Sequence, residues 1–229
     1  MKDNAIPVES VAVVVVSDEK KARETLKKFG SDLKNEYRTP DSDVSLCVEP
    51  ASPTVLPMTK ADSEKVVTLL TCMPNGLIEL SMDVAGLPQT SLNLGILTTS
   101  ENEVSASFCV RSSVSSQKEM LKKRLTRMTS LLGGTVSYFG EYPAWEFKSD
   151  SPILKLCADV YEKKFGKKPV ITAIHGGLEC GLFSEKMPGL DCVSFGPDIF
   201  DIHTPREKLS VSSLNRTWEF LLEVLKEMK

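Results

Sequence analysis

The order of helical and extended apolar runs constrains the fold of this 229-residue chain more than any other sequence feature. In the first part of the chain a strand and a helix precede two strands with hairpin character, and a further helix and strand follow them. This order is the signature of a split β-α-β sheet with its helices on one side. The expected elements are strands at residues 11–16, 44–48, 77–82, 90–99, 103–111 and 135–139, and helices at residues 19–37, 59–73 and 115–132.

After residue 146 the order of elements changes to helix, strand, helix, strand, helix, which is the layering of an α/β protein. Two or three strands are too few for an independent doubly wound domain, so this segment has the character of the tail of a larger sheet. The sequence therefore predicts an α/β chain in two parts, residues 1–146 and residues 147–229. The expected elements of the second part are helices at residues 152–165, 178–187 and 210–228, and strands at residues 170–174 and 191–195.

The composition excludes several classes of function. The formal net charge is -3, and no basic stripe with interleaved aromatic residues indicates a nucleic-acid surface. No apolar run reaches the roughly 18 residues of a membrane span, and the first residues lack a secretory signal. The six cysteines form no Cys-x-x-Cys pair and lie mostly in apolar patterns. This usage favours buried free thiols in a cytoplasmic protein over a disulfide framework.

Both histidines lie in the stretch of residues 171–207, which also holds the densest glycine usage. His203 follows a predicted strand in a loop, between Asp201 and Glu207. An imidazole there can bind zinc through one nitrogen while a neighbouring acid orients the other. The alternative is a surface histidine that is hydrogen-bonded to the loop backbone. Because no compact zinc motif surrounds His203, any metal site that uses it must draw its carboxylates from elsewhere.

Two further candidates, Arg111 and His175, have both a functional and a structural interpretation, and Asn4 has a structural one. Arg111, at the end of a predicted strand, can bind a substrate carboxylate in a bidentate pair or lie in water as an ordinary strand-end arginine. His175 and the two glycines after it can present backbone amides to an oxyanion, or the glycines can serve only the turn from strand to helix. Asn4 can be a turn residue before Pro7.

A cysteine hydrolase that uses Cys180 and His175 is a further hypothesis. The chain has the required residue types, but no spacing distinguishes them, and Cys180 fits the apolar side of a short helix. Insensitivity to thiol alkylation would exclude this hydrolase.

Several short strings occur in one order through essentially the whole chain and together resemble the C-terminal part of bacterial aminoacyl-histidine dipeptidases. These enzymes, also called Xaa-His dipeptidases or peptidase D, are carnosinase-type members of the di-zinc metallopeptidases related to aminoacylase and carboxypeptidase G. The most specific signal is IHGGLECGLF followed by a Gly-Pro and then by His-x-Pro-x-Glu. The strings are NAIP (4–7), PNG (74–76), TSLNLG (90–95), VRSS (110–113), YPAW (142–145), IHGGLECGLF (174–183), VSFGP (193–197) and HTPRE (203–207).

The resemblance implies a catalytic α/β domain with an inserted α+β lid that has a ferredoxin-like sheet. Residues 1–146 would form most of the lid, and residues 147–229 would form the closing C-terminal segment of the catalytic domain. In such enzymes two zinc ions activate a bridging water, and a glutamate acts as the general base.

The resemblance also implies roles for four residues of this chain. His203 would be the last zinc ligand. Asn4 and Arg111 would bind the C-terminal carboxylate of the substrate or polarise its scissile carbonyl. Gly177 would offer its backbone to the dipeptide.

The chain departs from the family pattern in the motifs that supply most of the metal site. The His-x-Asp motif, the bridging aspartate, the Glu-Glu pair, a further aspartate ligand and the Gly-Gly-His motif of the lid do not occur, and Arg206 stands where the family more often has an acid. The chain thus supplies one zinc ligand and no catalytic general base. We expect that alone it neither binds zinc tightly nor hydrolyses dipeptides, and that it is a truncated chain, a proteolytic fragment or the product of a split gene.

The alternative interpretation is a non-catalytic lid or dimerisation module. Lids of this group form dimer contacts through a helix and an edge strand, and residues 115–132 and 90–99 can serve for these contacts. The two interpretations are compatible, because one describes the parent enzyme and the other describes this piece. Together they predict a cytoplasmic dipeptidase that is a homodimer through its lid and has no nucleic-acid or membrane partner.

Overall fold

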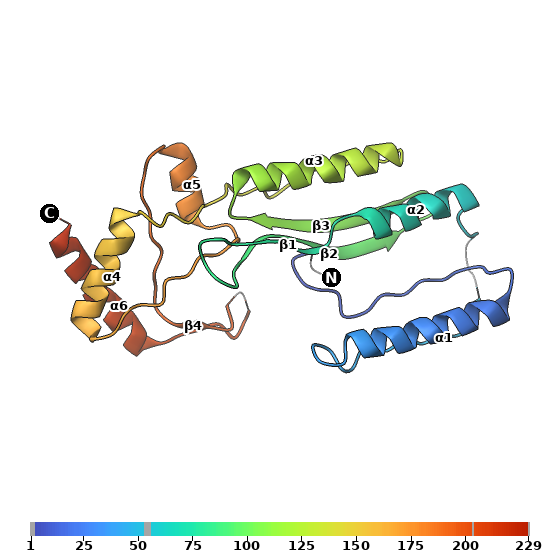
Figure 1. The fold of residues 1–229 in the computed structure, drawn as a ribbon, viewed down its shortest axis with the longest axis horizontal. Coiled ribbons are helices and arrows are strands. Elements are labelled where there is room, and N and C mark those ends of the chain that lie inside the picture. The colour runs from blue at the N-terminus through green and yellow to red at the C-terminus, as the bar shows by residue number, and fades with distance from the viewer. Residues whose placement is uncertain (1–2, 53–55, 203, 229) are drawn as a thin grey trace.

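The computed structural model describes residues 3–52, 56–202 and 204–228. Its mixture of helices and small sheets confirms the predicted α/β class, and every predicted helix is present. The C-terminal helices lie at one end of an elongated molecule, and the N-terminal helix lies toward the other end (Figure 1). The helices are α1 (Glu19–Glu36), α2 (Lys60–Cys72), α3 (Ser115–Leu131), α4 (Pro152–Phe165), α5 (Glu179–Lys186) and α6 (Val211–Glu227). The strands are β1 (Gly76–Leu80), β2 (Pro88–Thr99), β3 (Val104–Ser112), β4 (Ile199–Phe200) and β5 (Lys208–Leu209).

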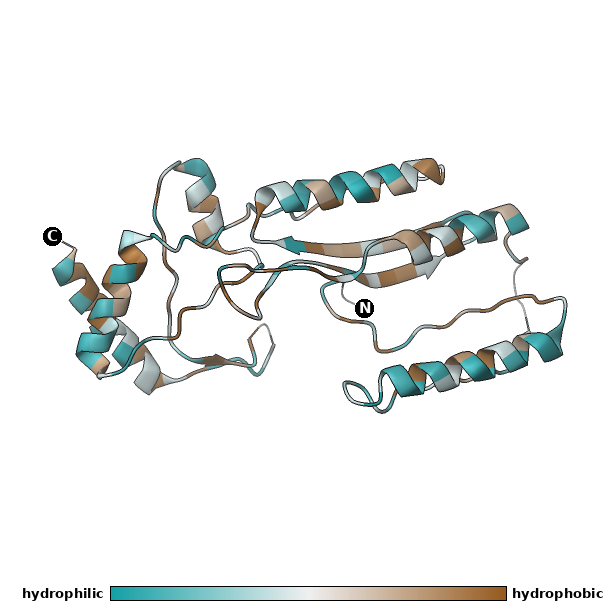
Figure 2. Cartoon of the chain, in the orientation of Figure 1, coloured by the Kyte–Doolittle hydropathy of each residue, from teal (hydrophilic) through white to brown (hydrophobic). Residues whose placement is uncertain are grey.

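The larger sheet has three antiparallel strands in the order β1-β2-β3. One face carries a hydrophobic core in which Met73, Leu92 and Leu125 are buried, and side chains of α2 and α3 close this core. The predicted placement of these two helices on one side of the sheet is therefore confirmed. Figure 2 shows β2 and β3 as largely hydrophobic, whereas α1 is mainly hydrophilic and has no buried residue.

The pairing of β2 changes along its length. β1 pairs with residues 88–92, and β3 pairs with residues 90–99. The expectation that residues 90–99 offer an edge strand is therefore wrong for the first part of β2, which has a neighbour on each side. Beyond residue 92, β3 is the only strand of the described residues that pairs with β2.

Three runs that the sequence predicts as strands, residues 11–16, 44–48 and 135–139, are extended but form no strand ladder. A strand needs a neighbour to pair its backbone groups, and the described part of the chain supplies none at these runs. The apolar side chains of the first run remain in solvent; Val11, for example, is 79% exposed. The outer strands of the predicted split β-α-β sheet are thus present as extended chain without pairing.

The C-terminal part is built on the packing of α4 against α6. Cys157 and Val160 of α4 are buried against Phe220 and Val224 of α6. The predicted strands at residues 170–174 and 191–195 are extended without a ladder, and β4 and β5 form a short antiparallel hairpin instead. This core and the core of the larger sheet lie on either side of residue 146, but the division of the chain into two domains stays a prediction.

Side chains cap the N-termini of several helices. Asp18, Ser151 and Ser210 accept backbone hydrogen bonds at the starts of α1, α4 and α6. The N-cap residue of α3 is Val114, which makes no side-chain cap bond. Ser112, two residues before Val114, accepts a hydrogen bond of 3.0 Å from the backbone N–H of Val114.

All six cysteines are free thiols, as predicted. Cys157 is buried, whereas Cys47 and Cys72 are exposed, so the prediction of buried thiols is wrong for these two. Cys47 lies in one of the extended runs that no neighbouring strand covers. No helix of the described residues is long and apolar enough to cross a membrane.

Candidate functional site

Two polar side chains of β2 hold distant segments of the chain against one face of the sheet. The Oγ atom of Ser91 lies 2.9 Å from Nε2 of His175. The amide nitrogen of Asn93 donates hydrogen bonds of 2.9 Å to the backbone carbonyls of Asp3 and Ala5. Because residues two apart on a strand point to the same face, while Leu92 between them enters the core, both contacts lie on the face opposite α2 and α3.

Asn4 lies between the two anchored carbonyls, and its side chain is exposed. Gly95 allows this arrangement, because a Cβ atom there would fall 2.3 Å from the backbone oxygen of Asp3. The N-terminal segment therefore crosses β2 in direct backbone contact, which a larger residue would prevent. The structure thus places Asn4 against the sheet that carries Arg111, the other residue predicted to bind the substrate.

Arg111 lies opposite Ser91 in the β2–β3 ladder, so the two side chains are neighbours on one face. Arg111 is exposed, and no carboxylate of the described residues forms an ion pair with it. Burial, and secondarily the charge of Arg111, hold the pKa of His175 below its ordinary value. A guanidinium beside a neutral imidazole, without an acidic partner among the described residues, is suited to bind a ligand carboxylate.

The linker YPAW packs against the glycine-rich loop. A Cβ atom at Gly177 would fall 2.5 Å from Cγ of Tyr142, and one at Gly181 would fall 2.9 Å from the backbone oxygen of Pro143. Neither glycine has a positive φ, so the close approach of the linker, and not a left-handed backbone, requires a glycine here. Lys118 of α3 donates a hydrogen bond to the backbone oxygen of Tyr142, which ties the linker to the helix above the sheet.

Of the four predicted site residues, the structure places Asn4 and Arg111 on the open face of β2 and β3, where Asn93 holds the segment of Asn4 and Ser91 lies opposite Arg111. Gly177 lies two residues after His175, which contacts Ser91, and packs against Tyr142. Sequence reasoning did not assign roles to Ser91 and Asn93. The signal that could have identified them is the alternation of polar and apolar residues in TSLNLG.

The predicted metal ligand, His203, lies outside the described residues. Its loop lies between β4 and β5, and Thr204 Oγ1 donates a hydrogen bond of 2.7 Å to the backbone oxygen of Asp201, which has a positive φ of 53°. Across residues 3–52, 56–202 and 204–228, no group of three histidine, cysteine or acidic side chains could hold a metal ion. The described residues thus do not form a zinc site by themselves.

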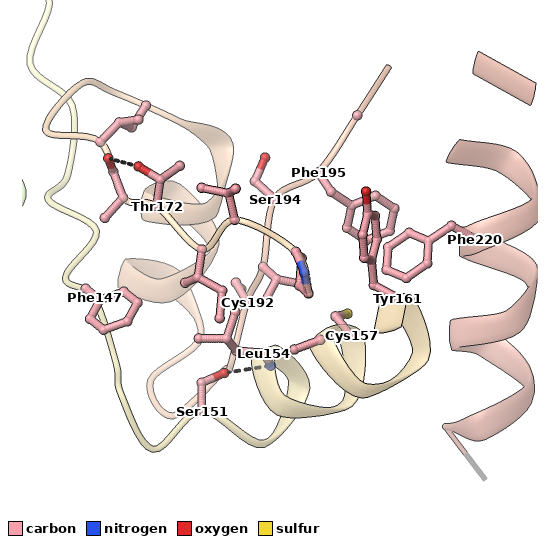
Figure 3. A pocket seen from close by; sticks show the side chains of 18 of the residues that line it. Phe147, Ser151, Leu154, Cys157, Tyr161, Thr172, Cys192, Ser194, Phe195 and Phe220 are labelled. Atoms are coloured by element: carbon pink, nitrogen blue, oxygen red, sulfur yellow. Dashed lines mark hydrogen bonds between the residues drawn. The ribbon is translucent and has the colours of Figure 1, made fainter. Parts of the chain in front are cut away.

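A cavity of about 530 Å³ lies in the C-terminal part (Figure 3), and its lining includes Ile174, the residue before His175. The rings of Tyr161, Phe195 and Phe220 lie together at one side of it, and the centroids of the last two are 4.9 Å apart. The extended runs at residues 170–174 and 191–195 also line it. Since both runs lack a strand partner, we interpret the cavity as space beside an unpaired part of the chain, and not as the predicted substrate site.

The cysteine-hydrolase hypothesis receives no support from the geometry. Burial, followed by the neighbouring Cys192 and Glu179, raises the pKa of the Cys180 thiol, so the thiolate nucleophile is disfavoured. Nε2 of His175 is engaged with Ser91 and does not serve Cys180.

The chain is similar to proteins of a known family. The sequence profile described as peptidase family M20/M25/M40 matches residues 1–227. The cytosol non-specific dipeptidase of Escherichia coli (strain K12) is 33% identical over 227 residues, which are 98% of this chain and 47% of the relative. The chain thus spans about half the length of this curated relative.

Two solved structures share the fold. The aminoacylhistidine dipeptidase from Vibrio alginolyticus matches with a TM-score of 0.83 and 34% identity, over 92% of this chain and 43% of that chain. The aminopeptidase PepT from Bacillus cereus ATCC 10987 matches with a TM-score of 0.55 and 20% identity, over 72% of this chain and 44% of that chain. The predicted resemblance to aminoacyl-histidine dipeptidases is confirmed. The match of the family profile along residues 1–227 shows that the chain belongs to peptidase family M20/M25/M40.

Proposed function

We propose that this chain is the substrate-binding part of a metal-dependent dipeptidase, and that Arg111 binds the C-terminal carboxylate of the dipeptide. One observation carries the proposal: the exposed guanidinium of Arg111 has no acidic partner among the described residues and lies beside the loop of His175. Arginine binds a carboxylate through two parallel, charge-assisted hydrogen bonds, which are roughly twice as strong as neutral ones.

The neighbours of Arg111 support the same assignment. Asn4 is anchored on the same face by Asn93, and its exposed side-chain amide is available to the substrate. Gly177 is exposed although Tyr142 covers one side of it, so its backbone remains accessible to a dipeptide. The Vibrio alginolyticus relative is named for aminoacyl-histidine substrates, and we therefore propose Xaa-His dipeptides as the substrates.

The metal is proposed to be zinc, with His203 as one ligand. The other ligands would come from outside the described residues, which contain no group of three suitable side chains. We accordingly propose that this chain alone holds no general base and is inactive, and that it is one portion of a longer or divided enzyme. The cytosolic relative supports a cytoplasmic location.

Carboxylate recognition is tested by calorimetric titration of the chain with Ala-His and with the C-terminal amide of the same dipeptide. Arg111→Gln loses two charge-assisted hydrogen bonds and should bind Ala-His at least about tenfold more weakly than the unmodified chain. The unmodified chain should bind the amide about as weakly as Arg111→Gln binds Ala-His. The matched control is Arg124→Gln, since Arg124 is an exposed arginine on α3. Equal affinities for Ala-His and its amide would contradict the proposal.

Inactivity of the isolated chain is tested separately. After incubation with zinc and removal of the excess, the chain should retain less than one equivalent by mass spectrometry of the metal content, and it should release no histidine from Ala-His. Measurable turnover that a chelator abolishes would show that the metal site is complete in this chain.

The alternative function is a lid that dimerises. α3 offers exposed apolar side chains, with Met120 45% and Leu131 72% exposed, and in the part of the chain that the structure describes β3 is an edge strand that pairs only with β2. We propose a homodimer through this helix and an edge strand. Sedimentation velocity over a hundredfold concentration range should show a dimer, and a strictly monomeric chain would exclude it.

A further inference from the structure

His175 is the residue through which the glycine-rich loop meets the sheet. Its Nε2 atom and the hydroxyl of Ser91, 84 positions apart in the sequence, form a half-buried contact of 2.9 Å. Ser91 is in turn the cross-strand partner of Arg111. The three side chains therefore form one cluster, which we call the Ser91–His175–Arg111 cluster.

The direction of the Ser91–His175 hydrogen bond decides what the other ring nitrogen can do. If Nε2 carried the proton and donated it to Ser91, Nδ1 would be a bare acceptor that repels a carboxylate. If Ser91 donates its hydroxyl hydrogen to Nε2, the proton of the neutral ring resides on Nδ1, which becomes a donor. No hydrogen bond joins Nδ1 to another of the described residues.

The surroundings favour a neutral ring that is ready to meet an anion. Half-burial and the nearby charge of Arg111 both disfavour the imidazolium. Arg111 has no carboxylate partner among residues that the structure describes, so the cluster holds a positive charge and no negative one. An arriving carboxylate would offset this charge and accept hydrogen bonds from both side chains.

We propose that His175 is a second carboxylate-binding residue of this site: Ser91 donates to Nε2, and Nδ1–H donates to the same peptide carboxylate that Arg111 binds. Ser91 then acts as a positioning residue that selects the tautomer. The inference rests on the proposed function, because the ligand is the C-terminal carboxylate of a dipeptide.

The presence of two histidines allows a direct test. Chain labelled with ¹⁵N-histidine shows two imidazoles, and His175→Gln identifies the signals of His175. At neutral pH, Nε2 of His175 should have the ¹⁵N shift of an unprotonated acceptor, and Nδ1 that of a protonated nitrogen. Unlabelled Ala-His should shift the Nδ1 signal saturably, and its C-terminal amide should leave the signal in place.

The variants separate the two roles. His175→Gln and Ser91→Ala should each weaken Ala-His binding by about tenfold, because each loses a hydrogen bond to a charged group or the tautomer that permits it. Ser91→Ala should also give a mixture of the two tautomers. The matched control is Ser105→Ala, an exposed serine on β3, which should change neither affinity nor tautomer.

The outcomes distinguish this inference from the proposed function. If Ala-His binds in an Arg111-dependent manner while the His175 signals and the affinity of His175→Gln stay unchanged, the inference is overturned and the proposed function stands. A protonated Nε2 in the Ala-His complex overturns it equally. If the amide binds as tightly as Ala-His, or if neither binds, carboxylate recognition by Arg111 fails and the inference fails with it.

Discussion

The ring of Tyr142 lies against the backbone of Gly177 so closely that a Cβ atom at Gly177 would fall 2.5 Å from Cγ of the ring. The linker and the glycine-rich loop meet at this contact. Tyr142 belongs to the linker that Lys118 ties to α3, and Gly177 belongs to the loop that His175 ties to β2. The contact therefore fixes the glycine-rich loop against the linker.

Gly177→Ala should consequently destabilise the fold by about 1–3 kcal/mol, because the new methyl group displaces the ring or the loop. The free energy of unfolding in urea measures this effect. The control is Gly176→Ala, where the nearest atom to the new Cβ is Cδ1 of Ile174 at 3.7 Å, an ordinary contact. The double variant Tyr142→Ala/Gly177→Ala should lose less than the sum of the single variants. Equal losses in the two glycine variants would refute the role of this contact.

Asn93 should be necessary for the position of Asn4. Asn93→Ala removes two hydrogen bonds to the backbone of residues 3 and 5, each worth about 1 kcal/mol. Hydrogen exchange of the amides in residues 3–6 should become faster, while exchange in α3 stays the same. Asn102→Ala, in the exposed turn between β2 and β3, is the matched control. Unchanged exchange in Asn93→Ala would show that the hydrogen bonds of Asn93 are not needed to hold residues 3–6 against β2.

The depressed pKa of His175 predicts a pH dependence of stability. Burial, and then the charge of Arg111, lower its folded pKa below the ordinary value of 6.5. Between the folded pKa and about pH 6.5, the unfolded chain therefore binds more protons than the folded chain. The contribution of His175 to stability is thus fully present above about pH 6.5 and is lost as the pH falls through 6.5 toward the folded pKa. Denaturant midpoints between about pH 5 and pH 8 should show this loss, and His175→Gln should reduce it. Arg111→Gln should raise the pKa of His175, as followed by the pH dependence of its ¹⁵N signals. An unchanged pKa would place Arg111 too far away to act on the imidazole.

The helices could be predicted from the sequence because their signals are local. The spacing of apolar residues, Pro152 at a helix start and Gly166 at a helix end all act within one or two turns, and Gly166 indeed adopts a φ of 68°. The pairing of strands could not be predicted in the same way. Residues 11–16 and residues 90–99 have equally strong strand patterns, but only the second run finds neighbours among the described residues. Pairing depends on partners that the pattern itself does not contain.

In the candidate site, too, the long-range contacts could not be predicted from the sequence. The resemblance to a family predicts Arg111, Gly177 and Asn4 as site residues, and the structure places Arg111 and Asn4 on one face of the sheet. The side chains that hold them there were not predicted, because a contact such as Ser91–His175 joins residues 84 positions apart. The contact that requires a glycine at residue 177 is not predicted either, since nothing in the local string reveals the ring of Tyr142 against it.

The six thiols should react with iodoacetamide in an order that follows their exposure and pKa. Cys47 and Cys72 are exposed and should be alkylated first. Cys157 is buried, and burial raises its pKa, so it should react last and at a rate limited by opening of the α4–α6 core. Burial also raises the pKa of Cys180, which should make it slower than the two exposed thiols. Peptide mapping by mass spectrometry of samples quenched over time gives all six rates at once. Cys180 reacting faster than Cys47 at neutral pH would indicate an activated thiol, and it would restore the cysteine-hydrolase hypothesis that the geometry around His175 disfavours.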